Sequence, residues 1–290
     1  MLEQIIITTL IMGGVYALLA AGFSLIFGSA RIINMAHSAF FMLAAYGMFY
    51  SMREGGLAAI PSIILTVTTV TIAGILVYRF LINRVRQHMV AVLLITIATA
   101  LVFQEIMVSR FGFHFRSAPY LIRGSTEILG VGVLNQLLLS LGIAGVVIVI
   151  VWLVLTKTKL GIAIRATAQD AEMANLMGIN VPRTLLLTMG LATALAAVAG
   201  IVVAPLWPIH PYMWTAPLVM VMVIVILGGL GSVKGSLIGA FIIALVESLV
   251  VFLVPGGSFL KLAFVLLAMV IVLVVRPAGL YGRVFEEERL

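Results

Sequence analysis

The side chains of this chain that could carry chemistry are a few isolated polar groups within apolar sequence. Glu247 lies inside the apolar run 235–254, and Asn34, His37 and Ser38 follow the first apolar run. A carboxylate or an imidazole at such a position can bind an ion, relay a proton or line a solute pathway. The same groups can instead hydrogen-bond to a neighbouring helix, and for Glu247 and His37 we favour that structural role.

The sequence has none of the short motifs that assemble a catalytic or nucleotide site. It contains no P-loop, no Gly-x-Ser-x-Gly nucleophile motif and no His-Glu-x-x-His metal motif. It has no cysteine, and its 4 histidines are scattered, so we expect no metal site. We therefore expect a protein that is not an enzyme and binds no cofactor of its own. If the protein moves a solute uphill, the energy must come from elsewhere, and a separate ATPase that binds the protein would supply it.

Composition identifies the class of protein that must position these groups. The chain has 290 residues, of which 63% are hydrophobic and 9% charged, whereas soluble domains carry about 25% charged residues. The apolar runs are about 17 to 25 residues long, which suits membrane helices rather than barrel strands. A net charge of +7 could suggest nucleic acid, but the basic residues cluster at the ends of the apolar runs. We predict an all-α integral membrane protein.

We predict about eight or nine transmembrane helices, packed as a single transmembrane domain over residues 1–290. The runs at 35–50 and 216–230 are short, so they are candidates for broken or re-entrant helices. The predicted spans are residues 5–27, 35–50, 57–82, 89–109, 135–156, 184–204, 216–230, 235–254 and 259–275.

The charge distribution predicts an orientation in the membrane. If the polar segment 157–183 lies in the cytoplasm and the spans alternate, 12 of the 17 Lys and Arg residues face the cytoplasm. Basic residues prefer that side. We therefore place the N-terminus outside and the C-terminus in the cytoplasm.

The segment 157–183 contains the outline of a short capped helix. We predict that Thr167 caps its N-terminus and that Asp170 completes a capping box. Gly178 suits the position just past the C-terminus, and Pro182 prevents continuation.

The same short helix has an apolar face. Met173, Leu176 and Met177 follow helical spacing. A Met-rich face on a polar segment is typical of a surface that binds another protein. We predict a docking site for a soluble partner.

Two Gly- and Ser-containing segments, 27–40 and 228–240, interrupt the apolar sequence. Paired broken helices in two halves of a chain indicate a transport pathway. Ordinary cytoplasmic turns with small residues for helix packing are the alternative. The candidate pathway residues are Asn34, His37, Ser38, Gly228, Gly229, Gly231, Ser232 and Glu247.

Four segments in this order resemble branched-chain amino acid ABC transporter permeases of the hydrophobic amino acid uptake family, especially the H-type subunit. They are GGVYALLAAGFSLIFGSARIINMAHSAFFMLAAY at 13–46, LGIAIRATAQDAEMANLMGINVPR at 160–183, GGLGSVKGSLIGA at 228–240 and VVRPAGLYG at 274–282. One departure is Ser38, where the family usually has glycine after the histidine.

The resemblance implies a permease subunit of an importer in a bacterial or archaeal plasma membrane. Its partners would be two ATPase subunits, which bind ATP and Mg, a paralogous permease, and a periplasmic or extracellular solute-binding protein. Glu247 falls at a family-typical glutamate. The implied ATPase-coupling residues are Arg165, Asp170, Glu172, Met173, Leu176, Met177, Gly178 and Ile179.

Other functions stay open from the sequence. The resembling family also imports urea, short amides and other amino acids. An ion-coupled secondary transporter would need an intramembrane ion site, for which Glu247 is the one strong candidate. A membrane scaffold for a soluble enzyme is a third possibility, but it leaves the Gly-rich interruptions without a purpose.

Overall fold

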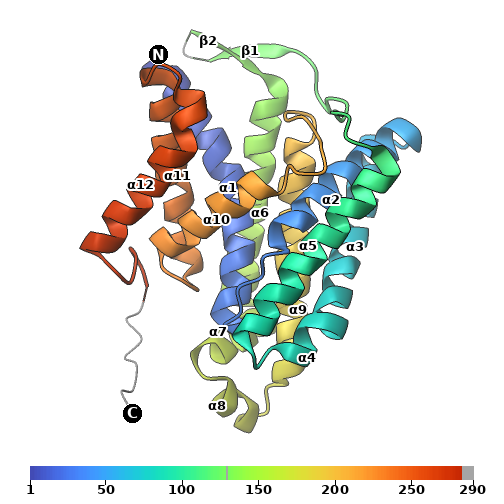
Figure 1. Ribbon diagram of the computed structural model, residues 1–290, viewed down its shortest axis with the longest axis vertical. Helices are drawn as coiled ribbons and strands as arrows, with labels where there is room; N and C mark the ends of the chain where they lie inside the picture. Colours follow the sequence, from blue (N-terminus) through green and yellow to red (C-terminus); the bar gives the residue numbers. More distant parts are fainter. Residues whose placement is uncertain (129, 283–290) are drawn as a thin grey trace.

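The computed structural model describes residues 1–128 and 130–282, which form a bundle of α-helices with one β-hairpin (Figure 1). Seven of the described helical segments are long and apolar enough to cross a membrane. This confirms the predicted all-α membrane class. The seven are α1 (Leu2–Ala30), Ala59–Val85, α5 (Met89–Phe111), α6 (Asn135–Lys157), α9 (Val181–Val203), α11 (Val233–Leu253) and α12 (Gly257–Val275). The segment Ala59–Val85 consists of α3 (Ala59–Val77), a π-helical turn η2 (Tyr78–Ile82) and α4 (Asn83–Val85).

Two apolar helices are shorter than these seven. Helix α2 (His37–Phe49) has 13 residues and continues into a π-helical turn, η1 (Tyr50–Glu54). Helix α10 (Thr215–Gly228) has 14 residues. An untilted crossing needs about 20 residues. The structure therefore agrees with the prediction that the runs at 35–50 and 216–230 differ from the full spans.

Helices α1 and α9 form the centre of the bundle. In their most apolar stretches 83% and 72% of residues are buried, against 17% in α6 and 6% in α12. Small residues allow this close packing. At Gly22 of α1, for example, a Cβ atom would lie 2.9 Å from the His37 ring. Helices α6 and α12 instead present apolar side chains to their surroundings, as lipid-facing helices do.

A β-hairpin occupies the loop between α5 and α6, where the sequence analysis predicted no regular element. Strands β1 (Ser125–Ile128) and β2 (Val131–Leu134) pair antiparallel, with Ile128 opposite Val131. The same loop also pairs with the α9–α10 loop, because Arg116 and Ile209 exchange backbone hydrogen bonds of 3.0 and 2.8 Å. The two loops therefore cover one end of the bundle together.

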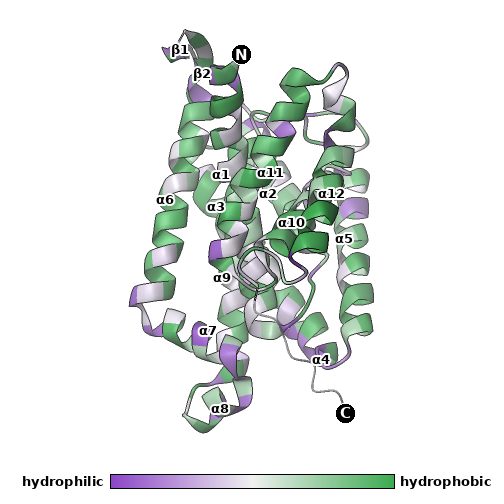
Figure 2. Ribbon diagram, turned by 90° about the vertical axis from the view of Figure 1, so that its left-hand side faces the viewer, coloured by the Kyte–Doolittle hydropathy of each residue, from purple (hydrophilic) through white to green (hydrophobic). Residues whose placement is uncertain are grey.

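The two ends of the bundle are distinct in both ribbon views. The N-terminus and the β-hairpin lie at one end, which we call the N-terminal end (Figure 1). Helices α7 (Lys159–Gln169) and α8 (Ala171–Leu176) protrude at the other, which we call the α8 end. Figure 2 shows hydrophilic residues gathered at α7 and α8 and hydrophobic residues along the long helices.

Candidate functional site

Helix α8 begins at a well-formed cap, although not the predicted one. The Asp170 carboxylate accepts hydrogen bonds from the backbone N–H groups of Glu172 and Met173, both 2.9 Å long. Thr167 is not the cap, since it lies buried within α7. Helix α7 starts earlier, where the Thr158 hydroxyl accepts the Gly161 N–H at 3.1 Å. The sequence analysis therefore placed the start of this helix three residues too early, and it did not predict α7.

Helix α8 ends at Gly178, as predicted. Gly178 has a φ of 86°, and its N–H bonds the Asn175 carbonyl. The Ile179 N–H bonds the Ala174 carbonyl, which completes a Schellman motif. The predicted role of Pro182, to prevent continuation of this helix, was wrong. Pro182 lies in the first turn of α9, where its missing N–H costs nothing, so it begins the next helix rather than ending α8.

Three apolar side chains form the exposed tip of α8. Met173, Leu176 and Met177 are 57%, 74% and 82% exposed. Glu172 is exposed beside them, and Ile179 is half-buried. Contiguous apolar surface on a protein is typical of a binding site. We call Met173, Leu176 and Met177 the apolar tip.

The two Gly-containing interruptions meet in space. A Cβ atom on Gly28 would lie 2.9 Å from the Gly231 carbonyl oxygen, and one on Gly231 would lie 3.0 Å from the Gly28 Cα. Gly231 has a φ of 82°, which favours glycine. The two interruptions are therefore in direct backbone contact, at the end of α1 and the turn before α11, and a role for them in a transport pathway stays a prediction.

The segment after α12 closes the end of α10. The backbone N–H groups of Leu280 and Tyr281 donate to the carbonyls of Leu227 and Gly228, at 2.8 and 3.0 Å. These carbonyls end a helix and would otherwise lack an intrahelical donor. Gly229, with a φ of 101°, turns the chain there.

The turn before α11 ends in a second cap. The Ser232 hydroxyl accepts the Gly235 N–H at 3.1 Å and so caps α11. Gly228, Gly229, Gly231 and Ser232 thus build a tight turn between α10 and α11.

The polar residues of the first interruption lie in the core. Asn34, His37 and Ser38 are 1% exposed or less. The His37 Nε2–H donates to the Leu19 carbonyl at 3.0 Å, which ties α2 to α1. The Asn34 side-chain oxygen accepts the Ala36 N–H at 3.1 Å. These contacts are structural, and a role of the three residues in a pathway stays a prediction.

Glu247 is buried but has two partners. The Tyr16 hydroxyl donates to one carboxylate oxygen at 2.7 Å, and the Lys261 ammonium binds the other at 2.6 Å. The group joins α11 to α1 and α12. The favoured role of Glu247, a hydrogen bond between helices, therefore has a specific geometry, with a salt bridge that the sequence analysis did not predict.

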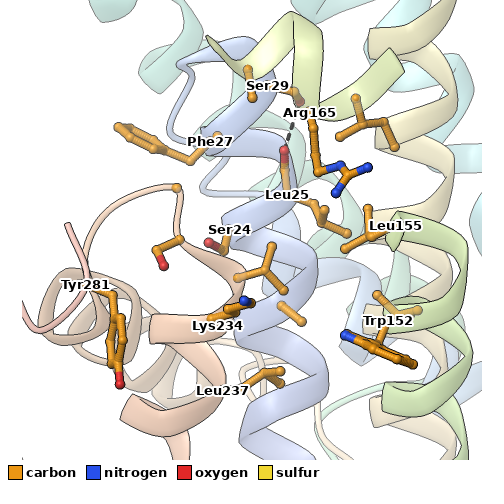
Figure 3. Close-up of a pocket in the computed structure, with 18 of the residues that line it drawn as sticks. Ser24, Leu25, Phe27, Ser29, Trp152, Leu155, Arg165, Lys234, Leu237 and Tyr281 are labelled. Atoms are coloured by element: carbon orange, nitrogen blue, oxygen red, sulfur yellow. Dashed lines mark hydrogen bonds between the residues drawn. The ribbon is translucent and has the colours of Figure 1, made fainter. Parts of the chain in front are cut away.

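A cavity of about 990 Å³ lies near the α8 end, between α1, α6, α7 and α11. Figure 3 shows Arg165 reaching towards it from α7, opposite Lys234 on α11. It brings together predicted residues from both interpretations, namely Arg165 of the coupling set and Gly231 and Ser232 of the pathway set. Lys234 was missed, although its place beside a Gly-rich turn was a usable signal.

Similarity to known proteins fits this architecture. The family described as "Branched-chain amino acid transport system / permease component" matches residues 5–275. The chain belongs to this family. The family resemblance inferred from the four segments is thereby confirmed, and so is the expectation of a membrane permease.

Relatives of this permease are similar over nearly their whole length. The high-affinity branched-chain amino acid transport system permease protein LivH of Salmonella typhimurium is 27% identical over 293 residues, covering 94% of this chain and 92% of LivH. BraD of Pseudomonas aeruginosa, which carries the same description, is 26% identical over 97% of this chain and 95% of its own. A probable LivH of Methanocaldococcus jannaschii is 27% identical over 97% of this chain and 92% of its own.

One solved structure shares the fold of this permease. It is PsaBC from Streptococcus pneumoniae in complex with Fab, with a TM-score of 0.54 and 12% identity. The match covers 94% of this chain and 92% of the other. At this identity the likeness concerns the fold alone.

Proposed function

We propose that this chain is the permease subunit of an ATP-driven importer of branched-chain amino acids, and that ATPase subunits dock on the apolar tip of α8. The names of its relatives support the substrate class. Urea, short amides and other amino acids are the alternative cargo of the same transporter class. The observation that carries the docking proposal is the exposure of Met173, Leu176 and Met177 on a helix with caps at both ends.

The proposed assembly contains more than this chain. ATP and Mg would bind to two ATPase subunits, a paralogous permease would complete the pathway, and a periplasmic or extracellular solute-binding protein would deliver the cargo. In a plasma membrane, the α8 end would face the cytoplasm and the N-terminus would face outward. The C-terminus would then be cytoplasmic, in agreement with the distribution of basic residues.

The packing of α7 and α8 gives the docked ATPase a path into the bundle. Helix α7 packs against α1 and α9, which form the core, and α8 leads directly into α9. ATP-driven closure of the ATPases would move α8 and shift these helices as rigid bodies. The remaining proposed coupling residues would shape and orient the contact between α8 and the ATPase. They are Arg165, Asp170, Glu172 and Gly178, with Ile179 beside them.

An ion-coupled mechanism is less well supported by the geometry. Glu247 already has Lys261 and Tyr16 as partners, at 2.6 and 2.7 Å. A carboxylate whose oxygens both have donors is a poor ligand for a transported cation. Uptake by the purified chain alone, abolished by an uncoupler, would support that alternative.

The test places charge on the apolar tip in the assembled transporter. Burying a Leu or Met side chain contributes about 1.5–3 kcal/mol, so Met173→Asp with Leu176→Asp should weaken ATPase docking about 100-fold or more. We expect solute-stimulated ATP hydrolysis in proteoliposomes to be lost, while the thermal unfolding midpoint of the permease is retained.

The matched control exchanges Met173→Leu and Leu176→Met. This pair keeps the apolar surface, so stimulated ATP hydrolysis should persist. Normal stimulation in the double Asp variant would show that the ATPases dock elsewhere.

A further inference from the structure

The cavity near the α8 end reaches the surface of the bundle. Helices α6 and α11 both pack against α1, and the cavity lies between them with α1 as its floor (Figure 3). Trp152 on α6 lines it and is 52% exposed. Lys234 and Arg165 also line it and are exposed. A molecule in the surrounding membrane can therefore enter from the side.

The walls of the cavity combine cations with apolar surface. Leu18 and Leu25 of α1, Leu155 of α6 and Leu237 of α11 supply apolar wall. The basic side chains are those of Arg31, Arg165 and Lys234, and the lining residues that the structure describes include no Asp or Glu. This composition matches a ligand with an anionic group and an apolar body.

A free amino acid does not suit these walls. Its carboxylate would find cations, but its ammonium group would find no carboxylate on the wall formed by residues 18–281. Burying a charge without a partner is costly. The cavity therefore differs from a site for the proposed cargo.

The Ser24 hydroxyl is a further feature of the wall. Ser24 lines the cavity, is fully buried, and has no hydrogen-bond partner among the described residues. A buried hydroxyl without a hydrogen-bond partner is destabilising. Figure 3 shows it on the same side of the cavity as Lys234. The site thus offers a polar group in addition to its cations.

We propose that this cavity binds an anionic phospholipid from the membrane leaflet at the α8 end. The lipid phosphate lies between Arg165 and Lys234. The parts of the acyl chains nearest the headgroup lie along α1 and α6 beside Trp152. Basic pockets between transmembrane helices bind anionic headgroups in this way. Trp side chains are enriched at the level of the lipid headgroups, where Trp152 would then lie. The bound lipid touches both α7 and the Gly-rich turn before α11.

The experiment uses the absence of cysteine from the chain, which lets one introduced cysteine carry a single fluorophore. Leu155→Cys places a bimane label in the cavity wall. Leu153→Cys is the matched control, because Leu153 lies on the same helix, is 42% exposed and does not line the cavity. Each labelled full-length chain is placed in phosphatidylcholine vesicles that contain a small fraction of either brominated phosphatidylglycerol or brominated phosphatidylcholine.

We expect brominated phosphatidylglycerol to quench the Leu155 label more strongly than brominated phosphatidylcholine at equal mole fraction. The Leu153 label should show no preference. One cation near the membrane surface is worth about fivefold in affinity for an anionic lipid. Lys234→Gln should therefore weaken the preference about fivefold, whereas Arg84→Gln on α4 should leave it unchanged.

A second measurement avoids the label. Phosphatidylglycerol retained by the detergent-purified chain is counted by native mass spectrometry, and the double variant Arg165→Gln, Lys234→Gln should lose it. Equal quenching by the two lipids at Leu155 would overturn the proposal. Quenching at Leu153 without quenching at Leu155 would also overturn it, because the cavity would then be closed to lipid, as when a second protein subunit fills it.

Discussion

The two ends of the bundle are held by different kinds of contact. At the N-terminal end, polar side chains join different helices and loops. Lys261 binds Glu247 at 2.6 Å, and the Trp214 indole N–H donates to Gln104 at 3.0 Å. Arg116 lies over the Phe49 ring at 5.2 Å. These directional contacts fix the relative positions of the helices and of the loops that cover them.

At the α8 end, close contacts between glycine backbones join the segments, beside a hydrogen bond of 3.4 Å from the Arg31 guanidinium to the Ala168 carbonyl. Gly28 packs on Gly231, and Gly228 packs on Gly235. Beside these contacts lies a cavity of about 990 Å³. Glycine surfaces allow close approach but supply no directional side-chain bond. We therefore expect the α8 end to be displaced more easily than the N-terminal end, as the proposed docking of an ATPase subunit there would require.

The largest effect that tests this comparison is expected at the Glu247 and Lys261 pair. Lys261→Met leaves the Glu247 carboxylate, which is 9% exposed, with Tyr16 alone. Removing one partner of a buried ion pair costs about 3 kcal/mol or more. The thermal unfolding midpoint in detergent should fall clearly.

The reverse change gives the control for that prediction. In Glu247→Gln the amide still accepts the Tyr16 hydroxyl, and Lys261, which is 41% exposed, reaches water. We expect the thermal unfolding midpoint to fall less in Glu247→Gln than in Lys261→Met. Equal losses would mean that burial of the carboxylate does not govern the stability of this end.

A smaller effect is expected from Gly28→Ala at the α8 end. The added methyl group would lie 2.9 Å from a Gly231 backbone oxygen, so the two segments must move apart. Overpacking of this kind costs about 1–3 kcal/mol. Hydrogen exchange should increase in α7 and in the turn before α11, and it should stay unchanged in the loops at the N-terminal end.

Gly142→Ala on α6 is the matched control. Nothing lies within 4 Å of the Cβ position at Gly142, and the residue is within a helix. Alanine there should be neutral or stabilising, by about 0.4–1 kcal/mol. An equal loss of stability in the two alanine variants would show that the backbone contact at Gly28 contributes no more to stability than the position of Gly142 does.

Much of this architecture could be predicted from the sequence because apolar run length is a local property. Seven long helices, two short ones and the end of α8 at Gly178 all follow from hydrophobicity and glycine position. The start of α8 was misassigned because Thr167 and Asp170 are both acceptable caps, and the packing of α7 on the core buries Thr167 within that helix. Local rules cannot weigh that packing.

The tertiary partners of the candidate residues could not be predicted. Glu247 and Tyr16 are 231 residues apart in sequence, and Gly28 and Gly231 come from opposite halves of the chain. Pairing of this kind depends on how the helices pack, which a single sequence does not specify. The β-hairpin was missed for a different reason, since its strands have four residues each and carry only a weak alternation.

The smallest predicted effect concerns pH at the N-terminal end. Partial burial lowers the pKa of His210 below its usual 6.5. The His210 and Phe115 rings form a T-shaped pair, with centroids 5.4 Å apart, in the two loops that pair there. Above pH 6.5 the imidazole is neutral in the folded and unfolded chains and contributes nothing to the pH dependence.

As the pH falls below 6.5, the unfolded chain takes up the His210 proton first, so the free energy of unfolding decreases. Below the lowered folded-state pKa, the loss is constant. His210→Gln should remove this component, measured as the difference between the two proteins in unfolding midpoint from pH 8 to pH 5. Hydrogen exchange should show the pH-dependent change in the paired loops and no change in α8. A change at α8 instead would mean that the two ends are coupled more tightly than their contacts indicate.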